Sequence, residues 1–173
     1  KIFLRSPLRY SRISSGFSER RLHPILKIYR PHPGIDYAAP RGTPVVAVGD
    51  GRVISKRWRN GYGRFIAIRH NNRYTTTYGH LSRYASKISK GSVVKQGQVI
   101  GYVGATGLAT GPHLDFRMKK NGSFVNPLKV RLPAARPISP DYLEAFRQRV
   151  AYLEDKLGQL LAQAETLGVK AAR

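Results

Sequence analysis

Histidine and carboxylate side chains are scarce in this chain, yet two pairs of them have a spacing suited to metal binding. Residues 1–137 contain only four acidic residues, and the whole chain contains five histidines. His32 stands four positions before Asp36. His113 stands two positions before Asp115, so on a β-strand their side chains emerge on the same face. Imidazole nitrogens and carboxylate oxygens that converge from separate segments are typical zinc ligands.

The same residues also have a simpler interpretation. A lone histidine usually lies at the surface or forms a hydrogen bond in the core, and either Asp36 or Asp115 could pair with one of the many basic side chains. Asp50 lies between two glycines, which is a turn signature. Each spacing is a weak pattern when taken alone, so the choice between a metal site and ion pairs depends on the surrounding sequence.

Charge and composition restrict the class of protein. The chain carries 31 Lys and Arg against 9 Asp and Glu, a formal net charge of +22. Five basic and five acidic residues cancel in residues 138–173, so residues 1–137 carry all of the excess. A segment with this positive charge is attracted to polyanions. The absence of cysteine excludes disulfides, thiolate nucleophiles and cysteine-bound zinc.

The elements that must position these residues are strands. Between about residues 42 and 130, short β-branched and aromatic runs alternate with Asp-Gly and Asn-Gly turns. This pattern predicts an all-β domain, an antiparallel β-sandwich or partly open barrel with a groove. In residues 1–37, Gly16, Pro24, Pro31 and Pro33 break any periodicity, so we expect this segment to be irregular. The segments 17–31 and 104–112 are expected to form the rims of the groove.

The end of the chain has a different pattern. We expect residues 1–130 to form the domain, with its core at about 12–130, and residues 131–140 to form a linker. Ser139 and Pro140 are a typical N-cap and first-turn pair. They introduce a C-terminal amphipathic helix, predicted over 141–173, whose apolar residues repeat every 3.5 to 3.6 positions. This helix should pack on the domain or pair with a neighbouring copy.

Three sequence motifs favour the metal-site interpretation of these spacings over simple ion pairs. Residues 32–45 read His-Pro-Gly-Ile-Asp-Tyr-Ala-Ala-Pro-Arg-Gly-Thr-Pro-Val and resemble the first motif of the lysostaphin-type (M23) zinc metallopeptidases. Residues 77–82, Thr-Tyr-Gly-His-Leu-Ser, resemble the middle motif. Residues 104–116 end in Thr-Gly-Pro-His-Leu-Asp-Phe and resemble the last motif, and Asn126-Pro127 follows as it does in the family. The resemblance covers about residues 12–130.

The resemblance implies roles for the matched residues. His32 and Asp36 correspond to metal ligands, with Asp115 at the position of the third ligand. His113 corresponds to a catalytic histidine and His80 to its partner. The implied reaction is metal-assisted hydrolysis, in which one Zn²⁺ ion polarises the scissile carbonyl and the two imidazoles move protons. The remaining histidines, His23 and His70, match no catalytic position and are expected to be structural or at the surface.

Asp115 departs from the family pattern, which has a second histidine there. Three explanations stay open: an alternative ligand, a natural loss of activity, or an engineered knock-out. We favour the first, because a carboxylate oxygen of Asp lies about as far from its backbone as the near ring nitrogen of His. A His-Asp-Asp set cancels the double charge of the metal, so we expect a more alkaline pH optimum than in Asp115→His. The harder ligand set also makes manganese a competitor of zinc.

The resemblance implies an endopeptidase that hydrolyses peptide cross-links of bacterial peptidoglycan. The alternative is a catalytically inactive M23-like domain that regulates or activates other hydrolases at the wall. We expect stem peptides as substrates and an anionic wall or lipopolysaccharide surface as a partner of the basic body. Nucleic acid is not expected, because the sequence contains no nucleic-acid-binding motif. The expected location is the periplasm or cell envelope, reached by export or through an anchor upstream of this chain.

Overall fold

A computed structural model describes residues 2–9, 12–22, 24–132 and 139–166 of the chain. The chain divides into two units, Lys1–Ala134 and Ala135–Arg173. Most of the predicted linker, residues 133–138, lies outside the described residues, as does the predicted end of the helix, 167–173. Within the described residues, no helix combines the length and the apolar character that crossing a membrane requires.

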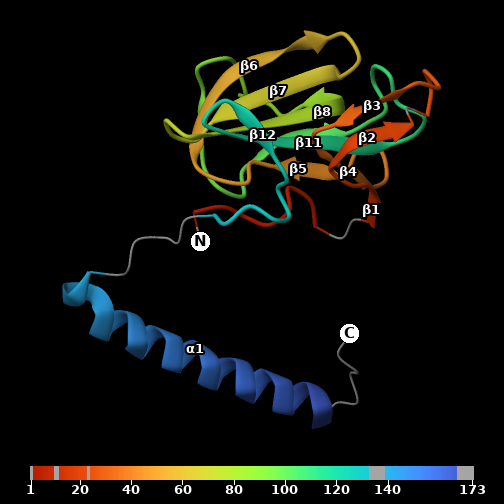
Figure 1. Cartoon of the computed structure of the whole chain (residues 1–173). Coiled ribbons are helices and arrows are strands. Elements are labelled where there is room, and N and C mark those ends of the chain that lie inside the picture. Colours follow the sequence, from red (N-terminus) through yellow and green to blue (C-terminus); the bar gives the residue numbers. More distant parts are fainter. Residues whose placement is uncertain (1, 10–11, 23, 133–138, 167–173) are drawn as a thin grey trace. The chain divides into compact units, whose positions relative to one another are not determined.

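The first unit is built on one antiparallel sheet with β11 and β8 near its middle (Figure 1). Its main path follows the order β1 (Arg12–Ser15), β4 (Ile35–Ala38), β11 (His113–Lys120), β8 (Tyr74–Tyr84), β7 (Gly63–Arg69), β6 (Gly51–Arg59) and β9 (Val93–Val94). Three further strands join this path, β5 (Pro44–Val46), β10 (Val99–Val103) and β12 (Ser123–Val125). The path ends at β1 and β9, so the sheet is not closed. The predicted all-β, antiparallel fold with a C-terminal helix is confirmed.

The expectation that residues 1–37 are irregular is wrong. This segment contains β1, most of β4, and a separate two-stranded sheet of β2 (Ser18–Leu22) and β3 (Tyr29–His32). The prolines are compatible with these strands because of their positions. Pro31 lies in a strand that pairs only with β2, where one edge needs no N–H donor. Pro24 lies in the turn between β2 and β3, and Pro33 separates β3 from β4.

A continuous apolar core supports the central strands. Its largest fully buried side chains include Tyr78, Phe116, Ile35, Ile66 and Leu114. The Tyr78 hydroxyl is buried with them, where it accepts hydrogen bonds from the Val48 N–H at 3.1 Å and from Thr76 Oγ1 at 3.0 Å. Burial raises the pKa of Tyr78 to about 12, so this hydroxyl stays neutral. The core thereby fixes β8 and β11, the strands that carry most of the predicted site.

The second unit is the helix α1 (Pro140–Thr166). Pro140 occupies the first turn, and the Tyr142 N–H donates to the Ser139 carbonyl at 2.9 Å, while the Ser139 hydroxyl donates to Asp141 Oδ2 at 2.9 Å. Asp141 lies in the first turn, where a negative charge interacts favourably with the helix dipole.

Candidate metal centre

The three predicted ligands lie together at the junction of three strands. Asp36 on β4 and Asp115 on β11 are directly opposite each other in the antiparallel register. His32 is the last residue of β3. One side-chain ligand atom from each residue lies within 4.8 Å of the others, and all three residues are buried. The fold thus brings together side chains that are separated by up to 83 positions (115 − 32) in the chain.

The hydrogen bonds of His32 leave a lone pair directed at a carboxylate. His32 Nδ1 lies 2.9 Å from the Gly16 carbonyl oxygen, which only accepts, so Nδ1 carries the proton. His32 Nε2 is then an acceptor, 3.0 Å from Asp36 Oδ1 and 3.9 Å from Asp115 Oδ2. Neither Nε2 nor Asp36 Oδ1 has a hydrogen-bond partner among the described residues, and both atoms are buried. Two buried acceptors that face each other need a cation between them, so these residues fit a metal ion.

Two arginines hold the carboxylates of this centre. Arg21 Nη1 donates to Asp36 Oδ2 at 3.2 Å. Arg117 binds Asp115 with two parallel bonds, Nε to Oδ1 and Nη2 to Oδ2, each of 2.7 Å. The guanidinium carbon of Arg117 also lies 4.6 Å from the centroid of the Tyr62 ring. Gly34 leaves the space for this side chain, because a Cβ there would lie 2.6 Å from Arg117 Cγ.

Arg117 changes the charge count made from the sequence. In that count, the two negative charges of Asp36 and Asp115 balance the double positive charge of the ion. The guanidinium of Arg117, which pairs with Asp115, adds one positive charge to this balance. The expected alkaline shift relative to Asp115→His should therefore be smaller than the ligand count alone indicates. The signal was present in the sequence, since residue 117 follows 115 at i+2 on the same strand and points to the same face. Arg21 gave no such signal, because its contact with Asp36 depends on the β2–β3 hairpin.

The environment keeps Asp36 ionised. Burial alone would raise the pKa of Asp36, but the surroundings, which include His32, His113 and Arg21, outweigh burial. The net effect lowers the pKa of Asp36 below its ordinary value. For Arg117, burial would lower the pKa, but the bond to Asp115 and its charge raise it. Both groups are therefore charged at neutral pH.

His80 and His113 form the second half of the site. Their ring centroids are 4.6 Å apart. His80 Nδ1 lies 2.7 Å from the Thr106 carbonyl oxygen, and His113 Nδ1 lies 2.8 Å from that of Gly111. Each Nδ1 is thus used by the backbone, which leaves both Nε2 atoms for other partners. Burial lowers the pKa of His80, the Thr106 carbonyl raises it, and the proximity of His113 lowers it; the net pKa is below the ordinary value.

The backbone at His80 is held in an uncommon conformation. His80 has a φ of +59°, in the left-handed region that non-glycine residues seldom adopt. Its N–H donates to the Tyr62 carbonyl at 2.7 Å, and Thr106 Oγ1 bonds both the Leu81 carbonyl at 2.8 Å and the Arg64 N–H at 3.0 Å. Strained residues of this kind cluster at functional sites. Thr106 therefore fixes both the backbone beside His80 and the orientation of its ring.

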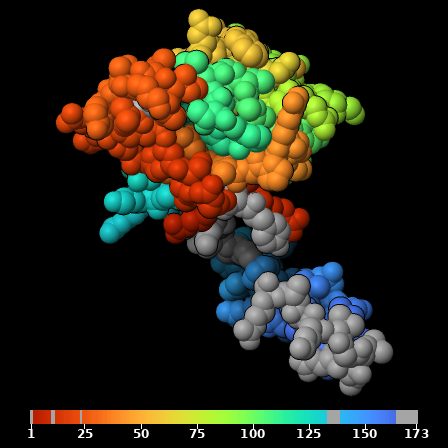
Figure 2. Space-filling view, turned by 90° about the vertical axis from the view of Figure 1, so that its right-hand side faces the viewer, coloured from red at the N-terminus to blue at the C-terminus, as the bar shows by residue number. Residues whose placement is uncertain are grey.

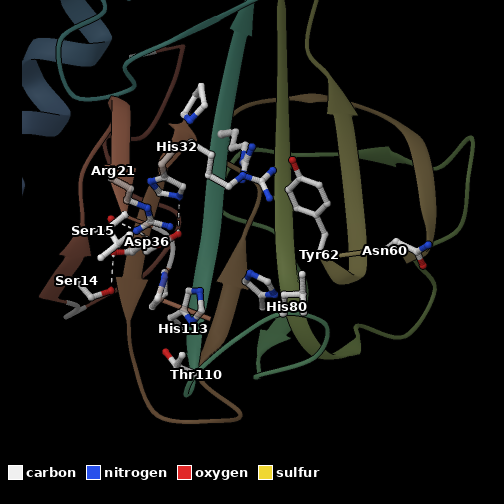
Figure 3. Close-up of a pocket in the computed structure, with 17 residues that line it drawn as sticks. Ser14, Ser15, Arg21, His32, Asp36, Asn60, Tyr62, His80, Thr110 and His113 are labelled. Carbon is white, nitrogen blue, oxygen red and sulfur yellow. Dashed lines mark hydrogen bonds and ion pairs between the residues drawn. The ribbon is translucent and has the colours of Figure 1, made fainter. Parts of the chain in front are cut away.

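His32, Asp36, His80, His113 and Arg117 line a groove of about 610 Å³. Figure 2 shows the segment coloured orange-red, near residues 20–30, beside the green segment that includes residues 108–113. Both predicted rims, 17–31 and 104–112, contribute to the lining. The turn at residues 60–62 forms a further part of the wall, which the sequence did not indicate; Figure 3 shows Asn60 and Tyr62 across the site from Arg21 and Asp36. Arg21, Arg30 and Arg117 make the groove basic.

His70, one of the two histidines without a predicted role, is separate from this centre. His70 contacts Phe3 edge-on, with ring centroids 5.0 Å apart, and its two ring nitrogens bond the Asp50 carbonyl at 2.8 Å and Thr76 Oγ1 at 2.7 Å. It is a hydrogen-bonded structural residue. His23 lies outside the described residues.

A buried His-Asp-Asp group beside two histidines, in a groove of an antiparallel sheet, is a site of the metallopeptidase class. Residues 30–127 match the model of peptidase family M23. This chain belongs to that family, which confirms the resemblance seen in its three motifs.

Two relatives match most of this chain. The chain is 46% identical over 165 residues to the peptidoglycan DD-endopeptidase ShyC of Vibrio cholerae, covering 93% of this chain and 37% of the relative. It is 45% identical over 163 residues to the DD-carboxypeptidase/endopeptidase Mpg of Neisseria meningitidis, covering 94% and 36%. The chain thus spans little more than a third of the length of these relatives.

Solved structures share the fold. A zinc-containing peptidase from Vibrio cholerae aligns with a TM-score of 0.71 and 41% identity, over 77% of this chain and 41% of that one. The catalytic domain of lysostaphin from Staphylococcus simulans aligns with a TM-score of 0.60 and 31% identity, over 68% of this chain and 90% of that one. The family match over residues 30–127 places the similarity in the β-sheet unit.

Proposed function

We propose that this chain is a metal-dependent endopeptidase that hydrolyses peptide cross-links of bacterial peptidoglycan. The observation that carries the proposal is the buried pair of acceptors, His32 Nε2 and Asp36 Oδ1, with Asp115 beside them. These three residues would hold one Zn²⁺ ion, and Mn²⁺ competes because two of the three ligands are carboxylates. A bound ion of this kind polarises the scissile carbonyl and activates water.

The imidazoles supply the proton chemistry in this proposal. Because the Thr106 and Gly111 carbonyls hold the two Nδ1 atoms, the neutral form of each ring has a free lone pair on Nε2, which can accept a proton or a hydrogen bond from a group in the groove. The lowered pKa of His80 keeps this ring neutral at pH 7. We assign His113 as the acceptor of the proton that the attacking water loses, which it can then donate to the leaving amine, and His80 as its partner in the groove.

The basic groove favours substrates with free carboxylates. Stem peptides of peptidoglycan carry such groups, and Arg30 lines the groove without belonging to the carboxylate pairs of the metal centre. The names of the relatives ShyC and Mpg support a D,D cross-link as the target. The net charge of +22 would attract the domain to an anionic wall or lipopolysaccharide surface. We place the protein in the periplasm or cell envelope, where this substrate lies.

One observation favours a second candidate, a catalytically inactive domain that regulates other wall hydrolases. Both oxygens of Asp115 accept hydrogen bonds from Arg117, so the third ligand is shared with a guanidinium. If Arg117 prevented Asp115 from binding metal, only His32 and Asp36 would remain.

Digestion of purified cross-linked muropeptides distinguishes the two candidates. Mass spectrometry of the products should show cross-linked dimers converted to monomers, with loss of activity in His113→Ala and in Asp115→Ala. Asp50→Ala is the matched control, because Asp50 is an exposed turn residue that pairs with Lys95 at 3.2 Å and does not line the groove. Unchanged dimers with the zinc-loaded wild type would favour the regulatory domain. Cleavage that survives Asp115→Ala would remove this residue from the machinery.

A further inference from the structure

Helix α1 exposes a continuous stripe of large apolar side chains. The stripe follows steps of three and four residues and consists of Leu143, Phe146, Val150, Leu153, Leu157 and Leu160. Five of these six are between 36% and 57% exposed, and Val150 is half-buried. Single exposed apolar residues are ordinary on a protein surface, but a contiguous row along one helix marks an interaction surface.

The spacing of the stripe identifies the kind of partner. Steps of three then four give a period of 3.5 residues, with Leu143, Val150 and Leu157 at the a positions of a heptad and Phe146, Leu153 and Leu160 at the d positions. A narrow seam with this period packs against another helix, whereas a helix lying on a globular core shows a wider apolar face. The opposite face is mostly polar and carries one large aromatic residue, Tyr152; on this face Gln148 bonds Glu144 at 3.3 Å and Gln159 bonds Asp155 at 2.8 Å.

We propose that α1 forms a parallel, two-stranded coiled coil with the same helix of a second copy of this chain. The charges beside the seam support this partner. In a parallel pair, a g residue faces the e residue five positions later on the other helix. Arg149 at g then faces Glu154 at e of the second copy, and the symmetry of the dimer makes this pair twice. The other facing positions, Tyr142 with Arg147 and Lys156 with Leu161, contain no like charges.

The antiparallel arrangement is less favourable. It brings e positions opposite e positions and g opposite g. The antiparallel alignment that pairs the e residues Arg147 and Glu154 also places the g residue Arg149 opposite Lys156. Because the dimer is symmetric, this repulsive pair of like charges occurs twice. A β-branched residue at one a position, Val150, with leucine at two of the three d positions is also the composition that favours two parallel strands.

The distribution of charge supports association through this segment. Residues 138–173 carry five basic and five acidic side chains and are neutral, whereas residues 1–137 carry the whole +22. Two copies repel each other through their catalytic units but not through their helices. Salt screens the repulsion between the units, so the dimer should strengthen at higher ionic strength. A dimer presents two catalytic grooves to one polymeric substrate, and the second contact benefits from a high effective concentration.

Cysteine cross-linking of the full chain tests the pairing directly, because the wild type contains no cysteine. Leu153→Cys places one thiol at a d position, which lies next to its own copy only in a parallel, in-register pair. Under mild oxidation this variant should convert to a disulfide-linked dimer. Gln148→Cys, on the polar face, is the matched control and should stay largely monomeric on a denaturing gel. Equal cross-linking of both variants, or none with Leu153→Cys, would overturn the proposal.

Sedimentation of the full chain provides the second measurement. The wild type should approach twice its mass of 19.4 kDa as its concentration increases. Leu153→Glu should remain a monomer, while Gln148→Glu, which adds the same charge on the outer face, should dimerise like the wild type. Arg149→Glu should weaken the dimer roughly tenfold by placing two like-charged pairs beside the seam, and adding Glu154→Arg should restore it. A wild type that stays monomeric, or a dimer that survives Leu153→Glu, contradicts the proposed seam.

Discussion

Replacing Arg117 with methionine tests how the charges of the centre are balanced. The substitution keeps an apolar stem of similar length but removes both hydrogen bonds to Asp115, whose side chain is 6% exposed. Removal of one member of a buried, bidentate ion pair costs about 3–5 kcal/mol, because the remaining charge stays buried without a partner. We expect the metal-free variant to lose about 3 kcal/mol of its free energy of unfolding at pH 7.

Zinc should reduce this loss. A divalent ion bound by His32, Asp36 and Asp115 compensates the carboxylate that Arg117 no longer neutralises. If zinc restores about 2 kcal/mol of the loss, linkage requires that the variant binds zinc roughly thirtyfold more tightly than the wild type. The assay is urea unfolding of metal-free and zinc-loaded protein, together with zinc titration against a chelating dye. Arg57→Met, at an exposed position of β6, is the matched control.

Two results would refute this reasoning. If the metal-free Arg117→Met protein were as stable as the wild type, the ion pair would not hold Asp115 in the way the geometry indicates. If zinc stabilised both proteins equally, Asp115 would not take part in metal binding.

Further predictions concern the stability of the fold and the backbone conformation beside His80. Tyr78→Phe should lower the free energy of unfolding by about 1–3 kcal/mol in urea, because the buried Val48 N–H loses its acceptor; Tyr142→Phe on α1 is the exposed control. Burial lowers the pKa of His70 below 6.5 despite the carbonyls of Asp50 and Gly49, so its stabilising contribution is complete above about pH 6.5 and decreases as the pH falls toward the lower pKa of the folded state. His70→Gln should therefore lose less stability than the wild type between pH 7.5 and about pH 5, and an identical pH dependence would contradict this. Gly63→Ala should abolish hydrolysis, because its Cβ would lie 2.3 Å from Thr106 Oγ1 in a backbone with φ of +63° and would displace the carbonyl that orients His80; Gly122→Ala, with open space around its Cβ, is the control for a positive φ.

The sequence was sufficient for the residues that lie within recognisable motifs. His32, Asp36 and Asp115 were predicted as a group, and the antiparallel register of β4 and β11 brings them together. The fold class followed from strand periodicity and turn residues, which are local properties. Metal binding itself, and the roles of His80 and His113, stay predictions that the experiments above address.

The parts that the sequence did not reveal depend on contacts between distant segments. The strands before residue 37 were missed because they are short, contain prolines, and pair with irregular register, as between Ile13 and Ser15 in β1. Arg21 reaches Asp36 only through the β2–β3 hairpin, and Tyr62 enters the site through a turn. Arg117 is different, since its position on the same strand face as Asp115 could have predicted the pair.

The central claim is that His32, Asp36 and Asp115 hold one metal ion. The most direct measurement is the metal content of the purified chain by elemental mass spectrometry, with Asp115→Ala and Asp50→Ala beside the wild type. We predict close to one equivalent of zinc in the wild type and in Asp50→Ala, and its loss in Asp115→Ala. Absence of metal from the wild type after reconstitution with zinc, or equal retention in all three proteins, would contradict the assignment of these ligands.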